Sequence, residues 1–255
     1  MRRQDKPYQG LARCLTVPAM AIVVSLIVPG TATGQAVDTN RPGFSFTPGI
    51  VADGRWQLET GIAYDRPGGG SHSISLPLAD ARFGLSEGVE LFVSSISWSD
   101  ANLGAGSASG LVDVAVGTKL ALTDNDAKTR MAVLFQLSVP TGDSDFSSDR
   151  YDPSAAFIWT HDGGIPLAGT VKVSRYREGF QLDNGLKLPF SLGGAHSAFV
   201  EWEASLPEGG NDVHWLNGGY QWLMDERMQL DANAGIGLND RAGDYRLGAG
   251  FSILF

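Results

Sequence analysis

The residues with the most catalytic potential are histidines, serines and glycines in short runs. The stretch 106–110 (GSASG) lacks the G-x-S-x-G spacing of a hydrolase nucleophile, and 235–237 (GIG) does not open a helical pattern. The acidic run 143–145 is typical of a solvated loop rather than a Ca²⁺ site. We therefore expect no enzyme, no metal site and no cofactor. No pair of histidines has zinc-ligand spacing, and all four lie at ends or turns of the strands predicted below: His72, His161, His196 and His214.

A second group of charged residues is better suited to line a passage. Its members share one face of segments that alternate apolar and polar residues, and small residues lie between them. Two roles remain open, because such charges either brace a filled lumen as a static network or line a path and set its selectivity. The candidates are Glu59, Glu90, Asp113, Lys119, Lys172, Asp183, Lys187, Glu201, Glu203, Asp231, Asp244 and Arg246.

The elements that position these charges are β-strands, because the sequence from residue 54 onward alternates with period two. In one segment, for example, Val114 and Val116 alternate with Asp113 and Ala115. Pro77 lacks a backbone donor and predicts a bulge in its strand. Turn residues divide this part of the chain into about twelve segments: 54–65, 72–85, 88–98, 109–122, 129–140, 151–162, 166–177, 180–192, 196–206, 213–223, 227–238 and 243–255.

The lengths of these strands favour a membrane barrel over a soluble sandwich. Each has at least eleven residues, whereas membrane strands need about 9–11 and soluble strands average about 5–6. A polar face of glycines and mixed charges suits a crowded, wet lumen. We therefore predict an all-β fold, a single antiparallel transmembrane β-barrel of about 12 strands. Aromatic residues near the strand ends are typical of an interfacial girdle: Trp56, Tyr64, Trp98, Tyr151, Tyr176, Trp215, Trp222 and Tyr245.

The first part of the chain has the order of a secretory signal. Basic residues in 1–13 precede the apolar run 15–28, and small residues follow up to residue 36. We expect residues 1–36 to be a cleaved signal peptide and to carry away Cys14, the only cysteine. Residues 37–53 then form a lead-in or a plug, and residues 54–255 form the barrel.

The net charge of the predicted mature chain limits the kinds of partner that it can bind. Residues 1–36 hold four basic residues and one acid, so 219 residues remain, with 15 basic and 27 acidic side chains and a net charge of −12. Such a balance argues against a nucleic-acid partner, because phosphates require basic patches. The expected partners are outer-membrane lipid, a small solute and the barrel assembly machinery, and the expected location is the outer membrane of a Gram-negative-type cell.

The last segment adds a specific prediction about assembly. Apolar residues alternate backwards from the final residue, as in the terminal strand by which outer-membrane barrels are recognised. The residues of this expected signal are Tyr245, Leu247, Phe251, Ile253 and Phe255.

Several phrases together resemble one family, the outer-membrane proteins of the MetA-pathway phenol-degradation family. The region 151–192 matches by strand pattern alone. The resemblance implies a barrel of about this size that passes small, apolar or aromatic compounds, and it brings no catalytic residues. The matching phrases are 41–44 (RPGF), 56–61 (WQLETG), 82–85 (RFGL), 89–91 (VEL), 113–119 (DVAVGTK), 138–142 (SVPTG), 229–231 (QLD), 235–238 (GIGL), Asp244 and 250–251 (GF).

Two classes of function remain open on the sequence. The first is a channel or transporter for small solutes. The second is a structural or interaction barrel that presents its outer loops without transport. Solute-specific uptake would separate the two.

Overall fold

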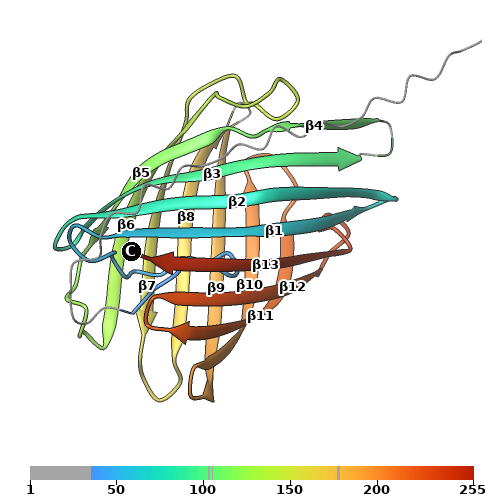
Figure 1. Ribbon diagram of the computed structural model, residues 1–255. Helices are drawn as coiled ribbons and strands as arrows, with labels where there is room; N and C mark the ends of the chain where they lie inside the picture. Colours follow the sequence, from blue (N-terminus) through green and yellow to red (C-terminus); the bar gives the residue numbers. More distant parts are fainter. Residues whose placement is uncertain (1–35, 103, 105, 177–178) are drawn as a thin grey trace, which may run out of the picture. The chain divides into compact units, whose positions relative to one another are not determined.

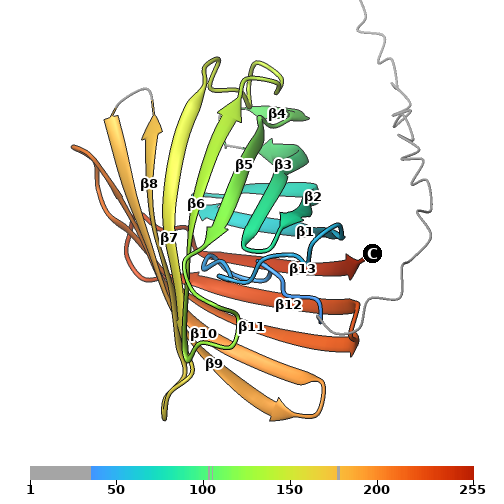
Figure 2. The ribbon, with the colours of Figure 1, turned by 90° about the vertical axis from the view of Figure 1, so that its left-hand side faces the viewer.

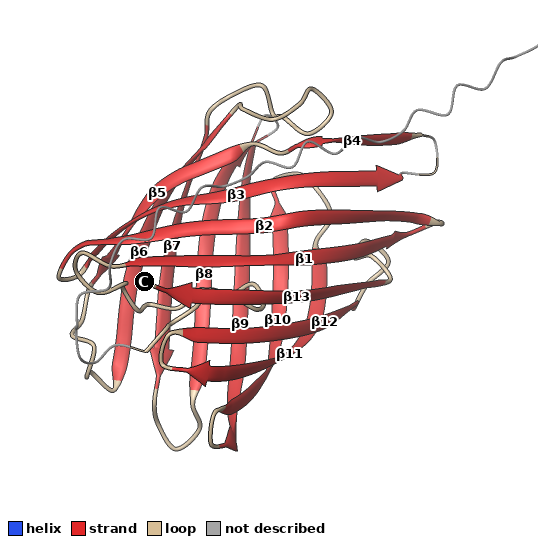
Figure 3. Cartoon of the chain, viewed as in Figure 1, coloured by secondary structure: helices blue, strands red, loops and turns tan. Residues whose placement is uncertain are grey.

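The computed structural model describes residues 36–102, 104, 106–176 and 179–255, so the predicted signal peptide lies almost wholly outside the described residues. The described chain consists of long antiparallel strands and their connections (Figures 1 and 3). No helix among these residues has the length and hydropathy to cross a membrane. The strands are β1 (Trp56–Gly68), β2 (Ser71–Ser86), β3 (Val89–Asn102), β4 (Ser107–Leu111), β5 (Val114–Ala121), β6 (Thr129–Val139), β7 (Asp152–His161), β8 (Leu167–Tyr176), β9 (Gly179–Gly193), β10 (His196–Pro207), β11 (Val213–Asp225), β12 (Met228–Gly237) and β13 (Tyr245–Leu254).

The strands close into a ring. Each strand pairs with its neighbours in the sequence, and the terminal strands β1 and β13 pair with each other over ten residue pairs, from Gln57↔Leu254 to Arg66↔Tyr245. The short β4 and β5 both pair with β3 and together fill one position in the wall. The ring therefore has twelve positions, as predicted, and closure pairs the two terminal strands, which would otherwise be sheet edges.

The hairpins extend further than expected at one end of the barrel. The sequence predicts loops over 66–71 and 99–108, but β1 and β2 continue to Gly68 and from Ser71, and β3 continues to Asn102. The prediction ended these strands where apolar alternation stopped. Ladder hydrogen bonds join backbone groups, so they continue into residues of any polarity.

The predicted strand 109–122 is wrong in one respect, because it breaks at Val112 and Asp113. The Asp113 carboxylate accepts hydrogen bonds from the backbone N–H groups of Gly142 (2.9 Å) and Ser148 (2.8 Å). These bonds anchor the long loop 140–151 at the break. Burial raises the pKa of Asp113, but the N–H donors of Ser148 and Gly142 outweigh it and hold the pKa below its ordinary value.

The predicted bulge at Pro77 is confirmed. The pairing of β2 with β3 shifts register between Leu76 and Ala79 and again between Ala79 and Ala81. Beyond these shifts, Arg82 pairs across the sheet with Gln57 on β1 and Phe92 on β3, so its side chain shares their face.

The outer face of the ring is apolar. Residues such as Val116, Phe135 and Val173 are 41–51% exposed, while their neighbours along each strand are buried or face the lumen. Of the predicted aromatic girdle, Trp56, Trp98, Tyr151, Tyr176, Trp222 and Tyr245 are exposed. The other two differ: Tyr64 is partly buried and stacks on His72, and Trp215 lies against the lumen-facing Arg246, with 4.6 Å from the guanidinium carbon to the ring centroid. An apolar exterior around a polar interior is the arrangement of a membrane barrel.

The terminal strand closes the barrel. The predicted signal residues Tyr245 and Leu247 are exposed on the outer face. Phe251 pairs with Thr60 on β1 and Leu230 on β12, and Ile253 pairs with Leu58 and Met228. Phe255 follows β13, and its N–H donates to the Trp56 carbonyl at 2.8 Å.

The alternation of faces predicts unequal costs for two adjacent substitutions in β5. Val116 is 41% exposed on the outer face, and Ala115 is 2% exposed and lines an interior cavity. We expect Val116→Arg to lower the free energy of unfolding by up to about 2–4 kcal/mol, because the charge enters the lipid-facing surface, where the cost is greatest at the midplane. Ala115→Arg, whose charge faces the cavity, is the control, and urea unfolding in lipid vesicles is the measurement. Equal destabilisation by the two variants would contradict this assignment of faces.

Candidate functional site

The segment that precedes β1, residues 37–53, lies inside the ring of strands and is called the N-terminal segment below (Figure 2). Val37, Ser45, Ile50 and Val51 are among its buried residues. Side chains that bind it come from β1, β2, β3, β5, β8, β9, β10, β11 and β12. The segment is therefore attached to most of the circumference of the lumen.

Three buried glutamates hold the N-terminal segment by its backbone. Glu59, Glu90 and Glu201 are each at most 1% exposed. The segment forms no named strand, so its N–H groups need partners other than a ladder, and these carboxylates supply them. The bonds run to Glu59 from the N–H groups of Asn40 (3.1 Å) and Arg41 (3.2 Å), to Glu201 from those of Phe44 (2.8 Å) and Ser45 (2.7 Å), and to Glu90 from that of Val51 (3.0 Å).

Three cations of the wall bind carbonyl groups of the same segment. Wall residues of both charges thus bind the main chain of the segment. Attachment of the segment to the wall therefore depends on its backbone path more than on its side chains. The donors and acceptors are Arg82 Nη1 to Asp38 O (2.6 Å), Arg82 Nη2 to Gly49 O (3.2 Å), Lys119 Nζ to Thr47 O (3.2 Å) and Lys187 Nζ to Ser45 O (2.9 Å).

The wall also makes room for this path. Gly185 on β9 faces the segment, and a Cβ there would lie 2.6 Å from Phe44 Cδ1, closer than real contacts allow. Gly218 on β11 is different, because the nearest atom to its Cβ would be the Phe199 carbonyl oxygen at 3.7 Å. A side chain at Gly185 is therefore incompatible with the observed position of the segment.

Beneath the segment, four buried charges form one cluster. Arg82 lies 2.7 Å from Glu59 and 2.8 Å from Glu90, and Lys119 Nζ lies 3.5 Å from Glu90. Every one of these side chains is at most 1% exposed. Two acids and two bases balance formally, which is what makes ionised groups tolerable away from water.

A second polar group joins β10, β11 and β13. Arg246 Nε donates to Asn217 Oδ1 at 2.9 Å, and the Asn217 amide donates to Glu203 at 3.2 Å. Arg246 also forms an ion pair with Glu203. Nearby, Arg41 of the N-terminal segment pairs with Asp231 at 3.2 Å.

The remaining predicted lumen residues have varied surroundings. Asp183 accepts hydrogen bonds of 2.6 Å from both Gln181 and Ser205. Lys172 lines interior cavities and is considered further below. Asp244 precedes β13, where its side chain is 59% exposed and lies 3.5 Å from Arg66. The predicted strand 243–255 includes Asp244 and places it on the lumen face, but β13 begins only at Tyr245.

Two central residues were missed by the sequence reasoning. Arg82 lies in the strand whose register Pro77 obscured, and alternation with Asp80 and Gly84 was the available signal. Arg41 lies outside any periodic segment, so only its place in the RPGF phrase marked it.

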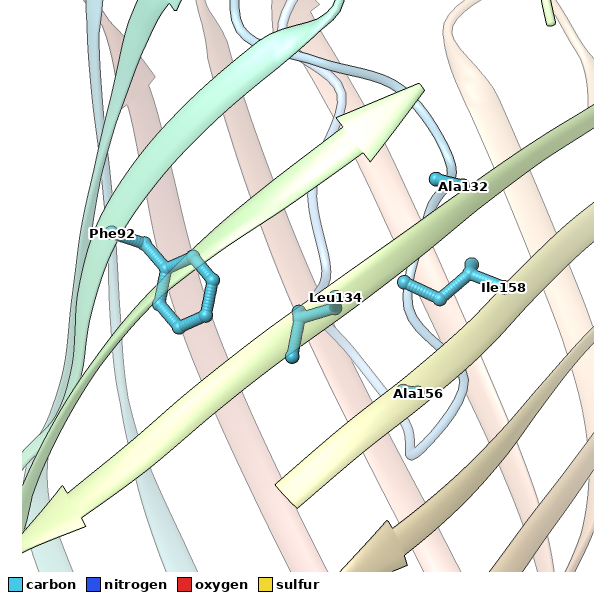
Figure 4. Packing of buried hydrophobic residues seen from close by; sticks show 5 residues of the cluster. All are labelled: Phe92, Ala132, Leu134, Ala156 and Ile158. Atoms are coloured by element: carbon cyan, nitrogen blue, oxygen red, sulfur yellow. The ribbon is translucent and has the colours of Figure 1, made fainter. Parts of the chain in front are cut away.

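An apolar patch interrupts the polar lumen. Phe92, Ala132, Leu134, Ala156 and Ile158 from β3, β6 and β7 form a cluster (Figure 4). Phe46 of the N-terminal segment packs against this cluster. Burial of apolar surface between wall and segment adds to the hydrogen bonds described above.

Two interior cavities flank this patch. The inner cavity, about 280 Å³, is bounded by Asn40, Arg41 and Phe46 of the N-terminal segment and by residues of the wall. The outer cavity, about 280 Å³, lies beside the loop 140–151 and is lined by Phe146 and Ser148 of that loop. Ser95, Gln136 and Lys172 line both cavities, so they mark the boundary between the two.

The histidines stand apart from these cavities. The His161 ring lies 2.8 Å from Thr129 Oγ1 and His196 lies 2.6 Å from the Tyr220 hydroxyl. His214 stacks on Trp202, and His72 on Tyr64. Among the described residues, no three His, Cys, Asp or Glu side chains are grouped to hold a metal ion.

The closed ring, the apolar exterior and the charged interior define the chain as an outer-membrane β-barrel protein. It belongs to the family described as "Putative MetA-pathway of phenol degradation", whose model matches residues 39–255. This family assignment agrees with the resemblance drawn from the sequence. No curated protein matches the chain.

Solved structures support the fold. An outer membrane channel from Pseudomonas putida F1 is similar with a TM-score of 0.66 at 12% identity, covering 81% of this chain and 97% of that chain. The KdgM porin in complex with disordered oligogalacturonate has a TM-score of 0.53 at 12% identity, covering 78% of this chain and 99% of that one. At such identities the likeness concerns the fold alone.

Proposed function

We propose that this barrel is a channel for small apolar or aromatic compounds, and that the N-terminal segment closes its resting lumen. The observation that carries the proposal is the apolar patch of Phe92, Leu134 and Ile158 inside an otherwise polar wall, in contact with Phe46 of the segment. A lumen built only to exclude water-soluble solutes has no need of apolar surface beside its cavities. Ligand sites are commonly apolar with a few polar groups that fix orientation.

The alternative is a structural barrel without transport. The many hydrogen bonds of the N-terminal segment favour this alternative, because they join the segment to nine strands of the wall. A structural barrel would remain closed to every solute.

Uptake into liposomes that contain the mature chain tests the proposal. We expect radiolabelled small neutral aromatic compounds such as benzamide to enter faster than into empty liposomes, while sugars of similar size show no acceleration. The physical reason is that the apolar patch and cavities of about 280 Å³ bind the former and not the latter. Equal entry of sugars and aromatic compounds would contradict solute selection, and no accelerated entry of either would favour the structural alternative.

A further inference from the structure

Lys172 is a lumen-facing cation without an ion-pair partner. It projects from β8, where it pairs across the sheet with Ala156 on β7 and Asp183 on β9. Within the part of the chain that the structure describes, no carboxylate lies within 4.0 Å of its ammonium group. Its electrostatic partner is Asp183, whose carboxylate already accepts hydrogen bonds from Gln181 and Ser205.

The other cations of the inner cavity are held in ion pairs. Arg41 is paired with Asp231 at 3.2 Å, and Arg82 with Glu59 and Glu90. Asp80 accepts the Ser95 N–H at 3.0 Å and is attracted by Arg82 and Arg41. Among the described residues, Lys172 is thus the cation of this cavity that lacks an ion pair, and its ammonium group can donate hydrogen bonds to a solute.

The carboxylates that line the outer cavity also have hydrogen-bond or ion-pair partners. Asp113 binds backbone N–H groups of the loop 140–151, and Asp152 lies 3.1 Å from Arg150. Hydroxyl groups surround Lys172 on this side, and the Ser174 hydroxyl is buried without a hydrogen-bond partner in the described structure. A solute that reaches Lys172 from this side therefore meets Lys172, Arg175 and the buried Ser174 hydroxyl.

Apolar surface lies on the other side of the same lysine. Phe46, Leu78, Phe92 and Leu134 line the inner cavity together with Lys172. Three of these residues belong to the patch shown in Figure 4 or pack against it. One cavity thus presents an ammonium group and an apolar wall to the same occupant.

From this juxtaposition we infer that the inner cavity binds small amphipathic anions, with the carboxylate on Lys172 and the apolar part against Phe46, Phe92 and Leu134. The inference rests on the proposed function and names a substrate class for it, namely aromatic or short aliphatic carboxylates. A carboxylate completes the ion pair that Lys172 lacks, and a charge-assisted hydrogen bond away from bulk water is about twice as strong as a neutral one. A cation would instead add positive charge beside Lys172, Arg41 and Arg82.

Binding of three matched probes tests the inference. The probes are 3-phenylpropionate, 3-phenylpropanol and 3-phenylpropylamine, which share an apolar part and differ in charge. Equilibrium dialysis with radiolabelled probes uses the mature protein in lipid nanodiscs, with empty nanodiscs subtracted. We expect the carboxylate to bind about tenfold or more tightly than the alcohol, and the amine to bind least.

Lys172→Met removes the charge and keeps the length of the side chain. We expect this variant to lose the preference for the carboxylate while its affinity for the alcohol stays within about twofold of the wild type. Lys128→Met, in the exposed connection between β5 and β6, is the matched control and should keep the preference. Heat-modifiable gel migration verifies that both variants are folded barrels.

Three results would overturn the inference. They are equal binding of the three probes, tighter binding of the amine, and an unchanged carboxylate preference in Lys172→Met. If any of them occurs while liposomes still take up neutral aromatic compounds, the proposed channel function stands and only the anionic substrate class is rejected. If uptake of neutral aromatic compounds also fails, the proposed function is rejected as well.

Discussion

Removal of residues 37–53 is expected to raise the ionic conductance of the barrel severalfold or more, without preventing its assembly. The N-terminal segment occupies the lumen, and its removal replaces peptide with water along the axis. The wall residues it leaves behind retain partners, since Arg82 pairs with Glu59 and Glu90, and Lys187 lies 3.9 Å from Glu201. Planar bilayer recording of the shortened and full chains measures the difference.

A point substitution gives a milder version of the same test. Gly185→Ala places a methyl group where Phe44 and Ser45 lie, so we expect it to displace the segment and raise conductance. Gly218→Ala meets nothing closer than 3.7 Å and should conduct like the wild type. Conductance that is unchanged in both the deletion and Gly185→Ala would show that the segment does not limit permeation.

Arg82→Met should lower the free energy of unfolding by about 3–5 kcal/mol, the largest loss that we expect from a single substitution. Arg82 is 1% exposed and is the bidentate partner of Glu90 at 2.8 Å for both contacts. Its removal leaves Glu59 and Glu90 buried with only Lys119 to balance them, and it frees the carbonyls of Asp38 and Gly49. Urea titration of the barrel in detergent micelles, followed by tryptophan fluorescence, measures the loss.

Arg66→Met serves as the matched control. Arg66 pairs with Asp244 at 3.5 Å, with side chains 39% and 59% exposed, and exposed pairs contribute about 0–1 kcal/mol. Adding Glu59→Gln to Arg82→Met should recover part of the loss, because the buried Glu90 and Lys119 then remain as a balanced pair. Similar losses for Arg82→Met and Arg66→Met would show that the buried cluster does not stabilise the fold.

The barrel was largely predictable from the sequence because long alternation is a strong signal when one face meets lipid. The predicted segment 129–140 differs from β6 by a single residue, and 196–206 differs from β10 by one. The predicted strand boundaries were wrong where the backbone pairing between strands does not depend on the alternation of side chains. The break at Asp113 depends on a loop about thirty residues away, and the extended hairpins depend on backbone bonds alone.

The contacts of the N-terminal segment could not be derived in this way. Glu59 and Glu201 are far apart in the sequence, and both bind the segment because ring closure brings β1 and β10 around one lumen. Alternation predicted that these acids share the inner face, but it carries no information on what they contact. The partners of Lys119 and Lys187 are carbonyl groups of the segment, and carbonyl groups are common to all residues.

The direct covalent link between the N-terminal segment and β1 has a kinetic consequence. Asp53 forms a bridge with Gly84 only three residues before β1 begins at Trp56, so a released segment remains near the mouth of the barrel. For a short tether the effective concentration is of the order of millimolar. A peptide of residues 37–53 supplied to a barrel that lacks them would therefore need roughly millimolar concentration to match the occupancy of the attached segment. Openings of the intact barrel should accordingly be brief and should end without any external ligand.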